Sequence, residues 1–397
     1  MPRRPPLPAG IWALGFVSLL MDVSSEMIHS LLPVFLVSGL GASMLTVGLI
    51  EGAAEATALM VKAFSGAWSD WMGRRKPLAL LGYGLGALSK PLFALANSAG
   101  MVLAARLVDR IGKGLRGAPR DALVADLVEP QVRGAAFGLR QALDTVGAVL
   151  GPLLGIALML LWANDFQAVF WVAVVPAALS VALLAFGVRE PAAAARRRRI
   201  NPIRRDNLRQ LRAAYWWVVG IGALLTLARF SEAFLVLRAQ QGGLATAWTP
   251  LVLIVMSVVY SAGAYPFGRL ADRVSHRTLL AAGLVVLVLA DLALALADQG
   301  WLLWAGVALW GLHMALTQGL LAALVAATAP EDLRGTAFGV FNLASGIALL
   351  VASTLAGFLW EAIGPAATFL AGAAFTAIAW AGLAWHARAV PRLDGGR

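Results

Sequence analysis

The chain has 397 residues, of which 60% are apolar and 13% are charged, and its mean hydropathy is +0.78. Soluble domains carry about 25% charged residues, so this composition excludes a soluble globular protein and indicates that lipid is the main solvent. The net charge is +11, and the chain contains no cysteine. Disulfides, thiolate chemistry and cysteine-ligated metal sites are therefore excluded.

Apolar runs of about 20 residues, the length that crosses a bilayer as a helix, recur along the whole chain. Strand-like alternation is absent, which predicts an all-α membrane protein with twelve transmembrane helices. The first six spans are predicted at approximately 10–37, 44–69, 77–97, 101–128, 132–162 and 166–188. The last six are predicted at approximately 213–238, 245–271, 278–297, 301–328, 335–361 and 365–387. The predicted domains are a six-helix bundle over 1–188, a basic linker over 189–212 and a second six-helix bundle over 213–397.

The linker holds nine arginines against Glu190 and Asp206. Nucleic-acid binding is one interpretation of such a run. A cytoplasmic loop that lies against anionic lipid headgroups is favoured, because the run separates two hydrophobic halves. The other connections alternate between basic loops and turns without Lys or Arg, and both ends of the chain are basic. This asymmetry predicts a multi-pass protein of a bacterial inner membrane with both termini in the cytoplasm.

The chain repeats its own motifs about 200 residues apart. Residues 66–76 read G-A-W-S-D-W-M-G-R-R-K, and residues 268–277 read G-R-L-A-D-R-V-S-H-R. Residues 133–138 (R-G-A-A-F-G) return as 334–339 (R-G-T-A-F-G), an offset of 201. Echoes in the same order at nearly one offset indicate two tandem repeats that run in the same direction, and hence two pseudo-symmetric bundles.

Two such halves joined by a long basic loop resemble the major facilitator superfamily. The loop after the second span carries the specific match. Gly66, Asp70, Gly73, Arg74, Arg75 and Lys76 resemble the signature G-x-x-x-D-x-x-G-R-R-x of that family, and Gly268, Asp272, Arg273 and Arg277 form a degenerate second copy. The resemblance covers essentially the whole chain. It implies a monomeric secondary transporter that uses alternating access, has no enzymatic activity or cofactor, and has a small molecule, protons and the bilayer as its partners.

The family also implies roles for the loop residues. Its loop aspartate lies at the start of the eleventh helix, so Asp70 is expected to cap the helix that begins near Arg334. Its adjacent arginine pairs with an acid at the end of the fourth helix, which implies an Arg74–Asp126 pair with Arg75 beside it. These residues are expected to form a gate and not to bind substrate.

Residues 147–155 read G-A-V-L-G-P-L-L-G and are similar to the G-x-x-x-G-P-x-x-G pattern of the family's antiporters, especially its twelve-span proton-coupled exporters. Gly147, Gly151 and Gly155 would form a smooth face for close helix contact, and Pro152 would bend the helix. An ordinary small-residue packing face is the alternative. The resemblance favours export, with these residues in the gating machinery.

The fourth predicted span carries an unusual number of charges, and charge inside a membrane is costly. Arg106 and Lys113 are seven residues apart and lie on one helical face, with Arg110 beside them. Arg106 also matches an arginine that the family carries in this span. The corresponding span of the second half has no charge, so the repeated fold does not require these residues. They are predicted to bind substrate.

Two further cations of this span, Arg116 and Arg120, allow another interpretation. In this interpretation they lie at the cytoplasmic interface, where their side chains snorkel and pair with Asp121 or Asp126.

Acidic residues occur at helical spacing in several spans. Asp22 and Glu26 are four apart with His29 one turn further on, and Glu51 and Glu55 repeat this spacing in the second span. Burial favours the neutral form of a carboxylic acid and a nearby cation favours the ionised form, so a change of pairing can move a proton. The predicted proton carriers are Asp22, Glu26, Asp144 and Glu232. Static ion pairs of the last two with Arg140 and Arg229 are the alternative.

Substrate-binding candidates outside the fourth span are Arg140, Arg229, Phe234, His313, Gln318 and Asn342. Packing is the alternative role for most of them. The absence of a phosphate-binding loop excludes ATP hydrolysis as the energy source, and the four histidines lack metal-ligand spacing. The sequence thus predicts a proton-coupled exporter of a small organic anion or zwitterion. The alternatives are a cationic drug as substrate, proton symport of an organic anion or metal chelate into the cell, and a receptor or scaffold without flux.

Overall fold

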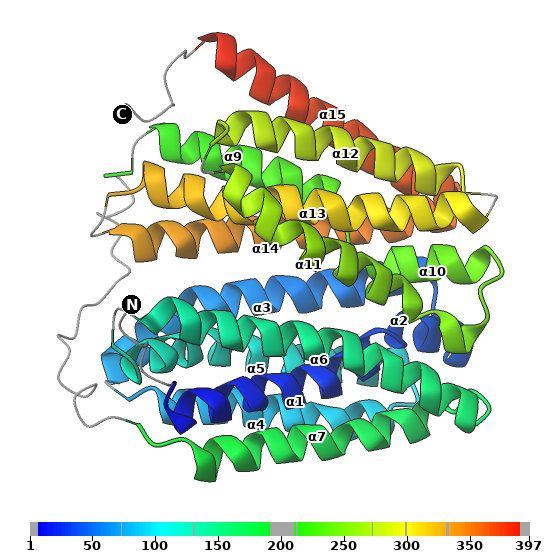
Figure 1. Cartoon of the computed structure of the whole chain (residues 1–397). Coiled ribbons are helices and arrows are strands. Elements are labelled where there is room, and N and C mark those ends of the chain that lie inside the picture. The colour runs from blue at the N-terminus through cyan, green and yellow to red at the C-terminus, as the bar shows by residue number, and fades with distance from the viewer. Residues whose placement is uncertain are drawn as a thin grey trace. The chain divides into compact units, whose positions relative to one another are not determined.

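A computed structural model describes residues 7–72, 74–129, 132–190, 210–211, 213–271, 273–297, 300–330 and 333–389. The side chains at 67, 70, 71, 318, 319 and 384–389 lie outside the description, as does most of the basic linker. Throughout the described residues the regular structure is helical (Figure 1). The predicted all-α fold is confirmed.

The chain divides into two compact units. Unit 1 comprises residues 1–41, 53–203 and 246–251, and unit 2 comprises 42–52, 204–245 and 252–397. The helices of the first half are α1 (Ala9–His29), α2 (Leu32–Val34), α3 (Met44–Met72), α4 (Lys76–Ala94), α5 (Ala99–Asp126), α6 (Arg133–Leu161) and α7 (Phe166–Gly187), with a π-helical turn at Phe35–Gly39. The second half contains α9 (Ala213–Ala228), α10 (Ala233–Gln241), α11 (Leu251–Ala271), α12 (His276–Ala295), α13 (Gly300–Thr328), α14 (Arg334–Ala362) and α15 (Pro365–Ala389), with a 3₁₀ turn at Thr246–Trp248.

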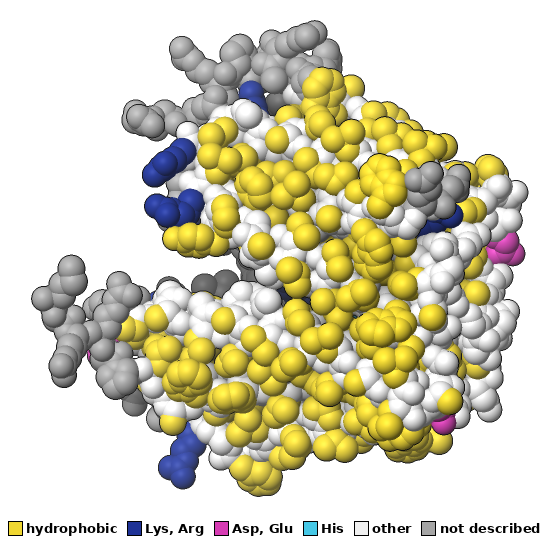
Figure 2. Space-filling model, turned by 45° about the vertical axis from the view of Figure 1, so that its right-hand side comes forward, with side chains coloured by type: hydrophobic (Ala, Val, Ile, Leu, Met, Phe, Trp, Pro, Cys, Tyr) yellow, Lys and Arg dark blue, Asp and Glu magenta, His cyan; other side chains and the backbone are white. Residues whose placement is uncertain are grey.

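Among the described residues, ten helical segments are long and apolar enough to cross a membrane. The helices α4 and α5, of 19 and 28 residues, complete the twelve predicted spans. Large apolar side chains such as Phe186 (88% exposed) and Trp301 (67% exposed) remain on the surface. Figure 2 shows that hydrophobic side chains cover much of one face, while Lys and Arg lie at its margins. Such a surface fits a lipid environment.

Both spans that open a repeat are interrupted, which the sequence did not predict. The first span breaks at Ser30–Leu31, after α1, and the seventh breaks between Ala228 and Ala233, after α9. Pro33 lies in the first turn of α2, where its missing N–H is tolerated. The two breaks fall at equivalent positions of the repeats. Discontinuous helices expose backbone polar groups inside a membrane, and transporters use them to build binding sites.

Glycines set the close helix contacts of unit 1. A Cβ on Gly82 of α4 would lie 2.7 Å from the carbonyl oxygen of Gly112 on α5, and a Cβ on Gly112 would lie 2.6 Å from that of Gly82. The two backbones therefore touch, and polar side chains further along α4 and α5 are brought together. Hydroxyls of α7 join that helix to α1, since Ser180 donates to the carbonyl oxygen of Val17 at 2.7 Å.

Candidate functional site

The charged fourth span is the 28-residue helix α5, whose N-terminus is capped by Ser98. Its cations lie largely inside unit 1, because Arg106 and Arg110 are each 3% exposed and Arg116 is 5% exposed. Lys113, one turn beyond Arg110, is exposed. The predicted common face is therefore present, with its inner part buried and Lys113 accessible.

Asp109 is the most enclosed acid on this face, at 2% exposure. Its Oδ1 lies 2.8 Å from Nζ of Lys90, a fully buried lysine of α4. Lys90 also donates to Oγ of Ser25 on α1 at 3.0 Å, and the Ser89 hydroxyl lies 3.3 Å from Asp109 Oδ1. The pair satisfies most of its own hydrogen-bonding capacity, as a buried ion pair must.

Arg110 connects α5 to two other helices. Its Nη2 lies 3.2 Å from Oε1 of Glu55 on α3 and 3.2 Å from Nδ1 of His29 on α1. The other imidazole nitrogen of His29, Nε2, lies 3.4 Å from Oδ2 of Asp109. Because a guanidinium only donates, the geometry fits a neutral His29 that accepts from Arg110 and donates to Asp109. The imidazole thus joins the two ion pairs into one network.

Two carboxylates lie at the accessible edge of this network. The side chains of Glu55 and Glu26 are 31% and 29% exposed, and Glu26 Oε1 lies 3.8 Å from Nδ1 of His29. Arg106 shares Glu55 with Arg110, at 3.9 Å. We call this set the charge cluster. Its members are Glu26, His29, Glu55, Lys90, Arg106, Asp109 and Arg110.

The remaining cations of α5 have partners near the other end of the helix. The Arg116 guanidinium lies 4.9 Å from the centre of the Tyr83 ring, a cation–π contact. Arg120 lies 3.2 Å from Asp121 Oδ1 and donates to Oγ of Ser18 at 3.1 Å. The predicted pairing of Arg120 with Asp121 is confirmed.

The glycine face of α6 lies against the helix that carries Asp22 and Glu26. A Cβ on Gly147 would lie 2.8 Å from the carbonyl oxygen of Leu19 and 3.0 Å from Cβ of Asp22. A Cβ on Gly151 would lie 2.8 Å from Cβ of Glu26. The predicted close contact is confirmed, and its partner is α1. Pro152 lies inside α6, at this contact.

Asp144 of α6 is held by an ion pair. Oδ2 of Asp144 lies 2.5 Å from Nη1 of Arg140, whose Nε lies 3.7 Å from Asp121. Asp144 and Arg140 thus form an ion pair with each other, which fits the static-pair alternative.

One predicted gate contact is wrong. Arg75 pairs with Asp126, with Nε 2.6 Å from Oδ2, whereas Arg74 is exposed. Arg75 is the N-cap residue of α4 and points into unit 1, where its backbone N–H also donates to the Glu190 carboxylate. Arg75 directly precedes the first turn of α4, whereas Arg74 lies one residue earlier in the loop. The side chain of Asp70 lies outside the described residues, so its capping role stays a prediction.

The sequence profile of the Major Facilitator Superfamily matches residues 14–256 and 239–396. The chain belongs to the major facilitator superfamily. This MFS transporter is 33% identical over 380 residues to an uncharacterized MFS-type transporter of Methanocaldococcus jannaschii, a match that covers 94% of this chain and 93% of its relative. It is 33% identical over 162 residues to the multidrug resistance protein MdtH of Photorhabdus laumondii, which covers 41% of this chain and 39% of that protein.

Solved structures of the superfamily share the fold. The crystal structure of the human organic anion transporter MFSD10 matches with a TM-score of 0.68 and 19% identity, over 96% of this chain and 100% of that chain. At this identity the likeness shows the fold alone.

In this MFS transporter, the substrate-binding residues predicted in the second half of the chain lie in unit 2. Phe234 is fully buried and packs on Phe230 and Trp360. His313 is 1% exposed, and its Nδ1 lies 2.8 Å from the carbonyl oxygen of Gly283. Both side chains therefore have packing or structural contacts in this conformation.

The other candidates of unit 2 are more accessible or undescribed. Arg229 and Glu232 are half-buried at the break between α9 and α10, and Asn342 is half-buried on α14. The side chain of Gln318 lies outside the described residues.

Sequence reasoning missed four members of the charge cluster as site residues, namely His29 and the three charged residues Glu55, Lys90 and Asp109. Lys90 is a lone lysine in an apolar span, Asp109 lies in the R-L-V-D-R stretch, and Glu55 shares helical spacing with Glu51. Charge inside a span was the available signal for all three. It was applied to the cations of α5 and not to the partners that their burial requires.

Proposed function

We propose that this MFS transporter couples the movement of a small organic anion or zwitterion to protons, and that it exports the solute in exchange for protons. The charge cluster of unit 1 is the observation that supports this function. It combines buried arginines with partly exposed carboxylates on helices α1, α3, α4 and α5. A cluster of this kind is costly in a membrane and is best explained by binding or coupling.

The balance of charge favours an anionic group on the solute. The three cations of the charge cluster, Lys90, Arg106 and Arg110, are matched in number by the carboxylates of Asp109, Glu55 and Glu26, so the surplus positive charge on this face comes from Lys113. Lys113 adds an accessible ammonium on the same face of α5. Within the described residues, Nη1 of Arg110 has no hydrogen-bond acceptor. A carboxylate or phosphate fits such guanidinium donors well, because it can accept two parallel hydrogen bonds.

The same geometry suggests how protons are coupled. Arg110 lies 3.2 Å from Glu55, and His29 lies 3.8 Å from Glu26. An anionic solute that binds Arg110 competes with Glu55 for the guanidinium, and a carboxylate that loses its cation takes up a proton more readily. Solute and proton binding are thereby linked without a metal or nucleotide. Asp22 and Glu26, on the helix that α6 contacts, are the predicted carriers, with Asp144 and Glu232 as further candidates.

The direction and the membrane are inferred from sequence. The Gly-Pro face of α6 is similar to that of the family's exporters, and it lies against the acids of α1. The match to MdtH, whose name describes multidrug resistance, adds support for export. The alternating basic loops favour a bacterial inner membrane with both termini in the cytoplasm.

A binding experiment tests the solute class. Purified protein in detergent would be scanned for thermal stabilisation by mono- and dicarboxylates and phosphate monoesters, with quaternary ammonium compounds as the competing class. We expect anions to stabilise the wild type and not Arg110→Ala. The matched control is Arg269→Ala, an exposed arginine of α11 over Tyr265, which should respond as the wild type does. Stabilisation by quaternary ammonium alone would support the cationic-drug alternative.

A flux experiment tests the coupling. Proteoliposomes loaded with a stabilising anion would be given an imposed pH gradient. A pH-sensitive dye inside would report the proton movement that accompanies efflux of the anion. Asp22→Asn and Glu26→Gln should abolish proton-driven flux while the protein remains folded. Wild-type rates in both variants would remove these residues from the mechanism. Absence of flux for every stabilising anion in the wild type would favour a receptor.

A further inference from the structure

Asp291 of α12 is a buried acid that the charge cluster does not include. It is fully buried, four residues before the end of the helix, and neither carboxyl oxygen has a hydrogen-bond partner in the described part of the protein. Buried polar groups are nearly always paired, so each exception requires a physical reason. A carboxylate left in such a place without a partner would be very unfavourable, and the group neutralises instead.

The immediate surroundings of Asp291 are apolar and closely packed. A Cβ on Gly372 of α15 would lie 2.8 Å from Oδ2 of Asp291 and 3.1 Å from the Phe230 ring. Phe230 also packs on Trp310 of α13, with ring centres 5.4 Å apart. The indole Nε1 of Trp310 is buried and, among the described residues, has no acceptor. The Asp291 carboxyl thus lies close to Gly372 of α15, which the Phe230 ring also approaches.

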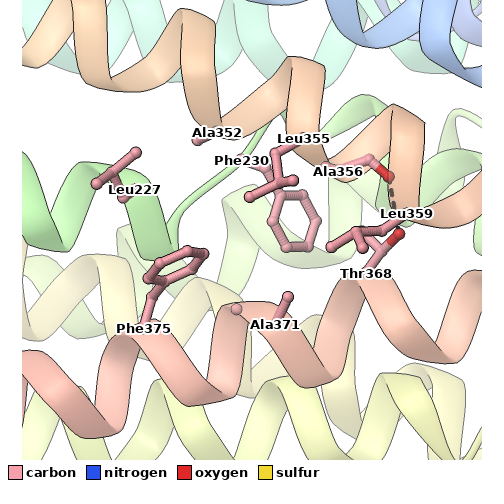
Figure 3. A pocket seen from close by; sticks show the side chains of 10 residues that line it. Leu227, Phe230, Ala352, Leu355, Ala356, Leu359, Thr368, Ala371 and Phe375 are labelled. Atoms are coloured by element: carbon pink, nitrogen blue, oxygen red, sulfur yellow. Dashed lines mark hydrogen bonds between the residues drawn. The ribbon is translucent and has the colours of Figure 1, made fainter.

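A small apolar pocket lies beside Gly372, with Phe230 and side chains of α14 and α15 around it (Figure 3). Its lining is apolar apart from Thr368, whose hydroxyl donates to the carbonyl oxygen of Ala356 at 2.9 Å. Movement of α15 away from α12 would expose the carboxyl without breaking an ion pair of the described residues.

Among the described residues, no titratable group of the neighbouring elements forms a hydrogen bond with Asp291. His313 of α13 contacts the Gly283 carbonyl, and Arg238 of α10 donates from Nε to the carbonyl oxygen of Leu294 at 3.0 Å. Arg229 and Glu232 lie half-buried at the break between α9 and α10. The described side chains of α15 include no Asp, Glu, Lys, Arg or His.

The internal repeat supplies the comparison. An offset of 201 places Asp291 on Lys90 and Trp310 on Asp109. In unit 1 these positions form a salt bridge of 2.8 Å, in which each charge is satisfied by the other. In unit 2 the same positions hold an acid and an indole. The fold keeps an ionisable group there, but no counter-ion lies beside it among the described residues, so a proton is the group that can balance the charge.

We propose that Asp291 is a proton-binding site of unit 2, separate from the charge cluster, which holds its proton in this conformation and releases it when α12 and α15 separate. Asp291 lies toward the end of α12 remote from the basic loop that precedes this helix, the side that the charge asymmetry assigns to the outer aqueous phase. The release step rests on the proposed proton coupling. Proton binding by Asp291 in this conformation is independent of that proposed coupling.

Infrared spectroscopy tests the proton directly. The wild-type protein in detergent at neutral pH should show the carbonyl band of a buried neutral carboxylic acid, and Asp291→Asn should lose it. The control is Asp165→Asn, the exposed N-cap of α7, which should leave the band unchanged because asparagine also caps helices. If the asparagine variant fails to fold, Asp291→Leu serves in its place. A carbonyl band that neither variant alters would overturn the proposal. A band that is absent at high sodium and appears only when sodium is removed would also overturn it, because the carboxylate would then bind sodium in place of a proton.

Flux tests the release. Asp291→Asn should still bind a stabilising anion and exchange it across the membrane without a gradient. Its pH-driven flux should fall about tenfold. A variant with wild-type pH-driven flux would overturn the release step. If the wild type itself shows no pH-driven flux, the proposed function fails, and the infrared band still decides whether Asp291 binds a proton.

Discussion

Removal of Lys90 should be one of the most destabilising single changes in unit 1. Lys90 is fully buried and donates to Asp109 at 2.8 Å and to Ser25 at 3.0 Å. Removal of one partner from a buried pair costs about 3–5 kcal/mol, because the other charge stays buried. In Lys90→Met, Asp109 would retain the Ser89 hydroxyl at 3.3 Å and His29 at 3.4 Å, which places the expected cost near the lower end, about 3 kcal/mol.

Thermal unfolding in detergent, followed by intrinsic tryptophan fluorescence, measures this effect. A cost of about 3 kcal/mol corresponds to a fall in Tm of roughly 6–12 °C if about 2–4 °C accompany each kcal/mol in a unit of this size. The matched control is Lys62→Met, which removes an exposed lysine of α3 and should change Tm little.

A second variant separates charge from packing. Lys90→Met combined with Asp109→Asn removes both charges and should recover most of the lost stability, because no buried charge is left alone. Equal Tm values for Lys90→Met and the control, or no recovery in the double variant, would refute the assignment of a buried ion pair.

Two further substitutions test the helix contacts. Gly151→Val should destabilise the protein by about 1–3 kcal/mol and reduce flux, because its Cβ would lie 2.7 Å from the Val23 carbonyl oxygen on α1. Gly138→Ala, a position of the same helix with open space, should unfold at the wild-type temperature. Arg75→Ala should cost about 3 kcal/mol by leaving Asp126 without its 2.6 Å partner, whereas Arg74→Ala should be nearly neutral. Equal effects of the two arginine variants on Tm would contradict the observed pairing.

The spans and their grouping could be predicted because both depend on local composition. Lipid imposes a minimum apolar length and forbids unpaired backbone, so runs such as 166–188 predict helices closely, here Phe166–Gly187. The breaks at Ser30–Leu31 and after Ala228 could not be predicted. Pro33 follows the first break, and Arg229, Ser231 and Glu232 lie at the second, but the surrounding runs are apolar enough to count as spans, and hydropathy reports burial in lipid without reporting backbone continuity.

The candidate site was predicted in part for a similar reason. The charges of α5 are visible in the sequence because they violate the cost of burial, and the structure places Arg106 and Arg110 in one cluster. Which partners compensate them depends on helix rotation and packing, which are tertiary properties. Lys90 meets Asp109 because Gly82 and Gly112 let α4 and α5 touch, a contact between residues about 30 apart in the sequence.

Comparison of the two repeats separates the requirements of the fold from those of function. The helix pairs α4–α5 and α12–α13 occupy equivalent places in the two repeats. They differ in charge at equivalent positions, where one pair carries an ion pair and the other carries an acid. Lys90 and Asp109 neutralise each other, whereas Asp291 faces a protein environment with no counter-ion among the described residues. Because a protein gains nothing in stability from a lone buried acid, its presence needs a second explanation, and proton exchange supplies one. If unit 1 binds solute through a charge-balanced cluster while unit 2 carries an acid balanced only by a proton, the two halves contribute different steps to one transport cycle.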